Sequence, residues 1–129
     1  MIAVDTNILV RLLTGDDPRQ ASRAARVMER SDILIPKTVL LETEWVLRHA
    51  YDIDKSAVIK GFQALLGLPN VNVEDQQTVY QAIAWSESGL DFADALHLAA
   101  SAQAIRFVTF DKAFVKSARK HTSVDVVLP

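Results

Sequence analysis

Short apolar segments alternate with helical stretches along the whole chain, and this alternation restricts the possible folds more than any other feature. The apolar segments are residues 2–4, 33–35, 71–73, 107–110 and 124–128. The helical stretches start near residues 8, 18, 38, 55, 75, 91 and 111. Strands that alternate with helices are typical of a parallel sheet with helices on both faces. We therefore expect an α/β fold, with a helical hairpin at residues 75–104.

The chain has 129 residues, which predicts one domain, residues 1–129, with a substantial core. Half of the residues are hydrophobic and there is no cysteine, so disulfides and thiolate metal sites are excluded. No apolar segment has the roughly 18 residues of a membrane helix, and no signal pattern opens the chain. We expect a cytoplasmic location.

The charge distribution is uneven although the net charge is only −2. No Lys or Arg lies between Lys60 and Arg106, whereas the first 30 residues contain five arginines. Four of these arginines share one helix face, at positions 19, 23, 26 and 30. This face is interpreted as a solvated charged surface or as a phosphate-binding surface, and both interpretations stay open.

An aspartate follows an apolar segment at two places, Asp5 and Asp111. Ligands of open parallel sheets bind outside the carboxyl ends of the strands, where these side chains are expected. The segment before Asp5 is predicted to be a strand buried on both faces, and Thr6 or Asn7 is predicted to cap a helix that starts near residue 8. An ordinary turn or N-cap is the alternative role of Asp5.

Two glutamates in the helical stretch 38–50 differ in their neighbours. Glu44 has Arg48 four residues later, which predicts a surface ion pair. Glu42 has apolar neighbours at the corresponding positions, so its carboxylate is expected to lack a local cation. Burial of such a carboxylate is costly unless a metal or hydrogen bonds compensate. Glu42 is therefore the better candidate for chemistry, and a distant cationic partner is the alternative.

Two more acids lie in the first turn of the predicted helix that starts at residue 91. Asp91 is interpreted as the N-cap, which leaves Asp94 as the candidate functional acid. His97 shares their polar face and is interpreted as lining it only. If Asp5, Glu42, Asp94 and Asp111 converge, their repulsion requires a cation, and all-oxygen ligation suits Mg²⁺ or Mn²⁺.

Four sequence segments together resemble the PIN-domain ribonucleases of the VapC type, the toxins of toxin–antitoxin pairs. The segments are AVDTNILVRLL at the start, LLETEWVLR around Glu42, DFADALHLAAS around Asp94 and FVTFDKAF around Asp111. The resemblance covers essentially the whole chain. It implies a three-layer α/β/α sandwich with a central, mainly parallel sheet of four to five strands. It also implies that Asp5, Glu42, Asp94 and Asp111 are the catalytic, metal-binding acids.

The same resemblance implies supporting roles for Asn7, Thr109 and Asp91. It implies Mg²⁺- or Mn²⁺-dependent cleavage of RNA, a homodimer that can enter a higher toxin–antitoxin assembly, and inhibition by a VapB-like antitoxin. An acidic cleft needs peripheral cations to attract RNA. The candidate RNA-binding residues follow the two strand-end aspartates and are Arg11, Lys112, Lys116 and Arg119.

Three other functions remain as alternatives to the nuclease. An Asp-nucleophile phosphatase normally needs a second acid two residues after the first, where this chain has Asn7. A receiver-like signalling domain normally pairs two acids at the first strand end, whereas Asp5 stands alone. A PIN-like domain that binds without cutting is the third alternative, and the complete set of acids argues against it.

Overall fold

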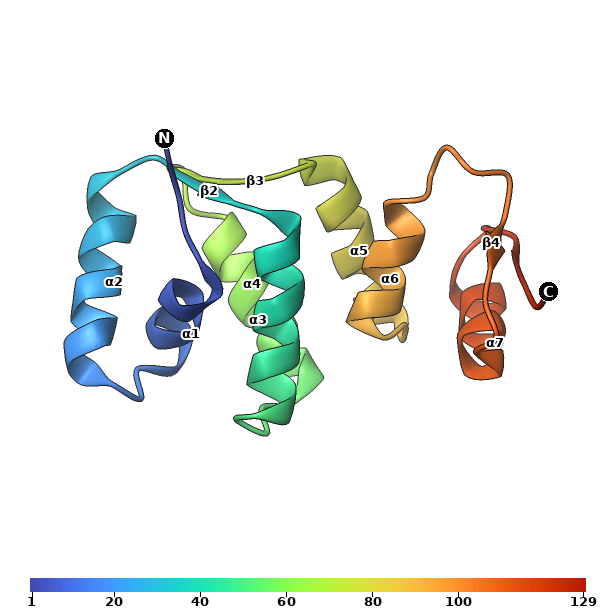
Figure 1. Cartoon of the computed structure of the whole chain (residues 1–129), viewed down its shortest axis with the longest axis horizontal. Helices are drawn as coiled ribbons and strands as arrows, with labels where there is room; N and C mark the ends of the chain where they lie inside the picture. Colours follow the sequence, from blue (N-terminus) through green and yellow to red (C-terminus); the bar gives the residue numbers. More distant parts are fainter. The chain divides into compact units, whose positions relative to one another are not determined.

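The computed structural model describes all residues from Met1 to Pro129 as two compact units, Met1–Gln76 and Gln77–Pro129, which are treated separately below. The first unit contains β1 (Ile2–Ala3), α1 (Thr6–Thr14), α2 (Pro18–Arg30), β2 (Ile33–Ile35), α3 (Lys37–His49), α4 (Lys55–Leu66) and β3 (Val71–Val73). The second contains α5 (Gln76–Ser88, which starts at the boundary), α6 (Phe92–Ala99), β4 (Phe107–Val108), α7 (Lys112–His121) and β5 (Val126–Val127). Figure 1 labels these elements.

The first unit is built on a parallel three-stranded sheet in the order β1-β2-β3. Ile33 lies opposite Ile2 on one side and Val71 on the other, and it is fully buried as the central strand requires. The prediction that the first strand is buried on both faces is wrong, because Ile2 is 48% exposed. Within this unit β1 is an edge strand, so no neighbouring strand covers its free side.

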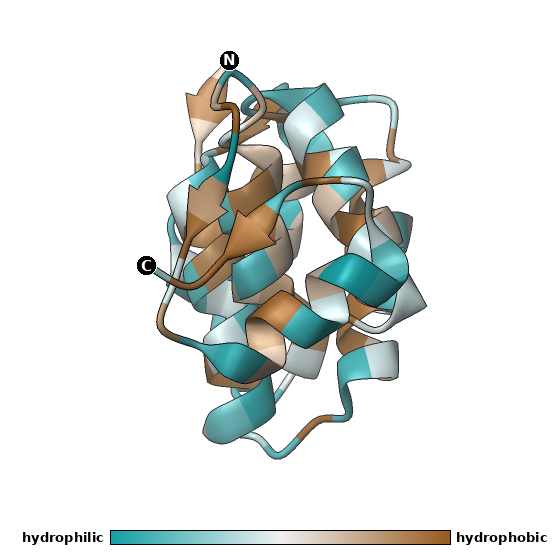
Figure 2. Ribbon diagram, turned by 90° about the vertical axis from the view of Figure 1, so that its right-hand side faces the viewer, coloured by the Kyte–Doolittle hydropathy of each residue, from teal (hydrophilic) through white to brown (hydrophobic).

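Four helices accompany this sheet in the first unit. Helix α1 contacts both α2 and α3, and it lies between them in Figure 1. Helix α4 contacts α3 and β3. The strands are mostly brown in Figure 2, whereas apolar and polar residues alternate along the helices, as expected for helices with one face on a core.

The second unit pairs β4 with β5 in parallel, with Phe107 opposite Val126. Helix α7 packs on β5, and Phe107 contacts Phe114 of α7 with 5.3 Å between the ring centroids. Strand β4 is shorter than the predicted strand 107–110, and Phe110, which lies beyond β4, is 87% exposed. All five strands of the two sheets are therefore in parallel pairs, as the alternating pattern predicts.

Aspartate side chains cap the starts of α2 and α4. Asp17 accepts a hydrogen bond from Gln20 N, and Pro18 occupies the first helical turn of α2. Asp54 caps α4 in the same way by accepting a hydrogen bond from Ser56 N, and α4 begins at the predicted residue 55. Helix α6 ends at Ala99, earlier than the predicted residue 104. None of the helices is both long enough and apolar enough to cross a bilayer.

Candidate functional site

Asp5 follows β1 and is the N-cap of α1. Its Oδ1 atom accepts a hydrogen bond of 2.7 Å from the backbone N–H of Thr6. The prediction that Thr6 or Asn7 caps a helix starting near residue 8 is wrong, because the extended backbone of Asp5 lets the helix begin at Thr6. The side chain of Asp5 is exposed, and Oδ2 has no protein partner. One oxygen of this carboxylate is therefore fixed and the other is available to a ligand.

Thr6 connects Asp5 to Glu42 within the first unit. The side chain of Thr6 is buried, and its hydroxyl donates a hydrogen bond to Glu42 Oε1 in α3. Glu42 itself is exposed and forms no ion pair. A single buried hydroxyl thus places a carboxylate of α3 beside the carboxylate that caps α1.

The surroundings of Glu42 and Glu44 differ from the prediction. Glu44 pairs with Arg48, with 3.2 Å between Oε1 and Nη1, but the side chain of Glu44 is only 4% exposed. The predicted surface ion pair is therefore largely buried, and Glu42 does not project from a buried apolar face. The reason is the orientation of α3, whose buried positions are Leu40, Thr43, Glu44 and Leu47.

Asp94 lies in the first turn of α6 in the second unit. Asp91 is the predicted N-cap and accepts a hydrogen bond of 3.2 Å from Asp94 N. Burial, together with the negative charges of Asp91 and Asp111, raises the pKa of Asp94 from 3.8 to about 6, and His97 acts in the opposite direction. Asp94 is thus a half-buried carboxyl among like charges, which disfavours its ionised form.

Asp111 is the N-cap of α7, where its Oδ1 accepts a hydrogen bond of 3.0 Å from Phe114 N. Its own N–H donates to Thr109 Oγ1 over 3.0 Å, and Thr109 N donates to Val127 O of β5. Thr109 therefore connects the start of α7 to the sheet and holds Asp111 at the strand end. The supporting role of Thr109 in the site stays a prediction.

The donor atoms on these acids fit a divalent cation. Carboxylate oxygens are ligands that divalent cations prefer: the first unit carries them on Asp5 and Glu42, and the second carries them separately on Asp94 and Asp111. A cation beside Asp94 would favour the ionised form, which burial and the charges of Asp91 and Asp111 disfavour. No group of three or more acidic or histidine side chains is arranged as a metal site. The convergence of all four acids on one ion stays a prediction.

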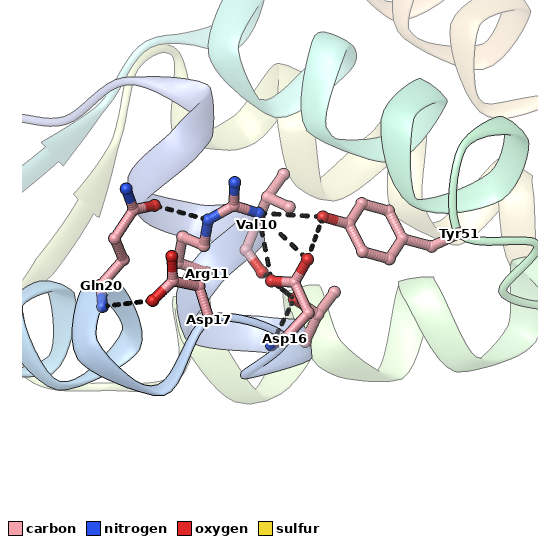
Figure 3. A network of polar contacts seen from close by, with 7 residues as sticks. Val10, Arg11, Asp16, Asp17, Gln20 and Tyr51 are labelled. Atoms are coloured by element: carbon pink, nitrogen blue, oxygen red, sulfur yellow. Dashed lines mark hydrogen bonds and ion pairs between the residues drawn. The ribbon is translucent and has the colours of Figure 1, made fainter.

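The predicted RNA-binding residues have different surroundings. Arg11 Nη1 lies 3.1 Å from Asp16 Oδ1 and 2.9 Å from the hydroxyl of Tyr51, which in turn donates to Asp16 Oδ2 over 2.6 Å (Figure 3). The hydrogen bond with Tyr51 raises the pKa of Arg11 and lowers the pKa of Asp16. Arg11 thus has an acidic partner already. The exposed candidate cations are on α7, at Lys112, Lys116 and Arg119.

Helices α1 and α2 border a cavity of about 610 Å³ that the motif analysis did not identify. Its lining includes Asn7, which was predicted only as a supporting residue, together with Arg23 and Arg26. The spacing of the arginines on α2 was the available sequence signal. That spacing defines a helix face, but it does not indicate that α1 lies opposite.

Comparison with known proteins gave one family match. The profile of the PIN domain matches residues 2–120. Among solved structures, the toxin VapC20 of Mycobacterium tuberculosis, described as cleaving the sarcin-ricin loop, is 24% identical, with a TM-score of 0.46 over 97% of this chain and 99% of that one. No curated protein matches the sequence significantly.

Proposed function

Because the chain belongs to the PIN domain family, we propose that it is a metal-dependent endoribonuclease and the toxin of a toxin–antitoxin pair. The observation that carries the proposal is the environment of Asp94. This carboxyl is half-buried near Asp91 and Asp111, with its pKa raised to about 6. An acid whose pKa is raised by burial and by neighbouring acids is typical of a functional site, because both causes disfavour its charged form and neither stabilises the fold.

The proposed metal-binding residues are Asp5, Glu42, Asp94 and Asp111. A bound Mg²⁺ or Mn²⁺ would supply activation of water and stabilisation of charge on the phosphate. Asn7, Thr109 and Asp91 are proposed as supporting residues. Residues 1–129 are proposed to act as one domain.

The chain itself contributes preorganisation of these acids. The N–H of Thr6 fixes one oxygen of Asp5, and the hydroxyl of Thr6 orients Glu42, so both carboxylates are held before any ligand arrives. Thr109 and the N–H of Phe114 hold Asp111 in the same manner. Fixed ligands cost less entropy on binding than mobile ones, which supports a role in chemistry.

Asp94 adds a proton-linked step. With a pKa of about 6, a fraction of Asp94 is protonated in weakly acidic solution, and this proton must leave before the carboxylate can bind a cation. Activity is therefore expected to rise between about pH 5 and pH 7. Below about pH 6 the carboxyl of Asp94 holds this proton in the metal-free protein, and above it the carboxylate is mostly ionised.

The proposed partners follow from the charges. RNA would be attracted by the exposed cations of α7 (Lys112, Lys116 and Arg119), with Arg11 as a further proposed contact. A VapB-like antitoxin would inhibit the nuclease by placing a basic side chain among the acids.

A homodimer, with or without a higher toxin–antitoxin assembly, is also proposed. Size-exclusion chromatography with light scattering, with and without the antitoxin, measures both assemblies.

RNA cleavage tests the function directly. Purified protein is incubated with RNA and Mg²⁺ or Mn²⁺, with and without EDTA, and the variants Asp5→Asn and Asp94→Asn are compared with wild type. Both variants should cut at least about 100-fold more slowly, since each loses a carboxylate that would hold the cation that stabilises charge on the phosphate. Glu29→Gln removes an exposed acid from α2 and should cut at the wild-type rate. Equal cleavage by all four proteins, or cleavage that survives EDTA, would contradict the proposal.

A further inference from the structure

The cavity between α1 and α2 has a floor of apolar side chains. Ile8 of α1 and Ala24 and Val27 of α2 line it, and its volume is about 610 Å³. This volume lies in the range of small-molecule sites, which are about 300–1,000 Å³. The cavity is therefore large enough for a planar ring, which these apolar side chains could contact.

Two cations without acidic partners also line this cavity. Arg23 and Arg26 are exposed, and neither forms an ion pair or hydrogen bond in the structure. The two residues are three apart in α2, a spacing that places their side chains on one face. Two unpaired guanidinium groups at one cavity favour an anionic ligand, and the planar fork of arginine suits a phosphate group.

Two amide side chains complete the polar lining. Arg11 Nε donates to Gln20 Oε1 over 2.7 Å, which directs the carbonyl oxygen of Gln20 toward Arg11 and leaves its amide N–H groups free (Figure 3). Asn7 lines the cavity from α1, two residues after Asp5. The cavity therefore borders the helix turn that Asp5 caps.

We propose that this cavity binds one nucleotide of single-stranded RNA beside the bond that is cut. Arg23 and Arg26 hold the phosphate, and the base lies against Ile8 and Val27. The proposal rests on the proposed function, because it deepens that function by adding a subsite for the same substrate. RNA fits better than an acidic peptide, since a nucleotide combines a flat ring with a phosphate, whereas a carboxylate side chain leaves the apolar floor uncovered.

The test uses two double variants with the same charge change. Arg23→Ala/Arg26→Ala removes the cations of the cavity. Arg19→Ala/Arg30→Ala removes two exposed, unpaired cations of the same helix that do not line it. The affinity of each protein for a fluorescent single-stranded RNA is measured in EDTA, where no cleavage occurs, over a series of salt concentrations.

The cavity variant should bind about 50-fold more weakly than wild type at low salt. Its slope of log K against log salt should fall by about 0.7, because the two arginines hold one phosphate and about 0.7 is lost per phosphate contact. The control variant should lose less than about 5-fold, since Arg19 and Arg30 do not line the cavity and act on a phosphate there only through the screened field. A photoactivatable thiouridine in the RNA should crosslink to the peptide containing Ile8 or Val27 in wild type, and the crosslink should be lost in the cavity variant.

Equal losses in the two double variants would overturn the proposal, because they would reflect net charge alone. Unchanged RNA binding by the cavity variant, together with weaker capture of a protein partner, would identify a protein site and also overturn it. If wild type binds RNA as described but cuts none, the proposed function fails, and the cavity is a nucleotide-binding site that serves no cleavage. If wild type cuts RNA and the cavity variant matches it in affinity and crosslinking, the subsite fails and the function stands.

Discussion

Replacement of Asp94 by Asn should stabilise the metal-free protein at neutral pH. The folded structure raises the pKa of Asp94 from 3.8 to about 6, first by burial and then by the charges of Asp91 and Asp111. The ionised form of Asp94 therefore disfavours folding. Asn has nearly the same shape without the charge, so the substitution removes this unfavourable energy while α6 keeps its N-cap, Asp91.

The magnitude follows from the pKa. One pKa unit corresponds to about 1.4 kcal/mol, so the change from 3.8 to about 6 sets an upper limit of about 3 kcal/mol. Asp94 is only partly buried and solvent screens its charge, so we expect about 1 kcal/mol. Between pH 3.8 and about pH 6 the folded state binds more protons than the unfolded state, so the stability of wild type falls as the pH rises through this window.

Urea denaturation in EDTA, measured between pH 4 and pH 8, tests this reasoning. The free energy of unfolding of Asp94→Asn should exceed that of wild type by about 1 kcal/mol above pH 7 and equal it near pH 4. Asp111→Asn is the matched control, because Asn also caps helices and removal of this charge relieves only a secondary cause of the shift. A variant that is less stable than wild type at pH 7.5, or a difference independent of pH, would refute the reasoning.

Four further results are expected. Gly89→Ala should destabilise the protein by about 1–3 kcal/mol in thermal unfolding, because Gly89 has φ +136° and a Cβ atom would lie 2.8 Å from Nε2 of His121. Gly61→Ala is its contrast and should stabilise by about 0.5–1 kcal/mol, since this helical glycine has room for a Cβ at 3.6 Å from the nearest side chain. Asn70→Ala should lower the free energy of unfolding in urea by about 1–3 kcal/mol, because Asn70 Nδ2 donates to two backbone carbonyls, one near the end of α2 and one just after it. Calorimetric titration should show tighter Mg²⁺ binding at pH 7 than at pH 5, because Asp94 must lose its proton, and equal affinity at both pH values would contradict this.

The helix starts could be predicted from the sequence because their cause is local. Asp17, Asp54, Asp91 and Asp111 each precede a helical stretch, and each accepts a hydrogen bond from a backbone N–H in the first turn, as a capping residue does. Asp5 differs only in that Thr6 follows it as a second possible cap. In the structure the carboxylate of Asp5 caps the helix. The PIN family resemblance, which depends on several such segments, is confirmed by the match over residues 2–120.

The exposure of individual acids could not be predicted in the same way. Whether Glu42 or Glu44 is buried depends on the rotation of α3 about its axis, and this rotation is set by packing against α1 and α4 rather than by neighbours in sequence. The hydrogen bond from Thr6 to Glu42 joins residues 36 positions apart, and no periodicity indicates it. The metal-binding role of the four acids stays a prediction for the same reason, since it depends on contacts distant in sequence.

Two of the proposed metal-binding acids also hold helix starts. Asp5 and Asp111 are ligand candidates and N-caps at once, so the effect of a substitution at either position depends on whether the new side chain can still cap the helix. An exchange for Asn preserves the cap and loses only the charge, whereas an exchange for Ala loosens α1 or α7 as well. Variants that escape a toxic activity by mutation should therefore divide into two kinds, abundant inert proteins with Asn and scarce, protease-sensitive ones with Ala.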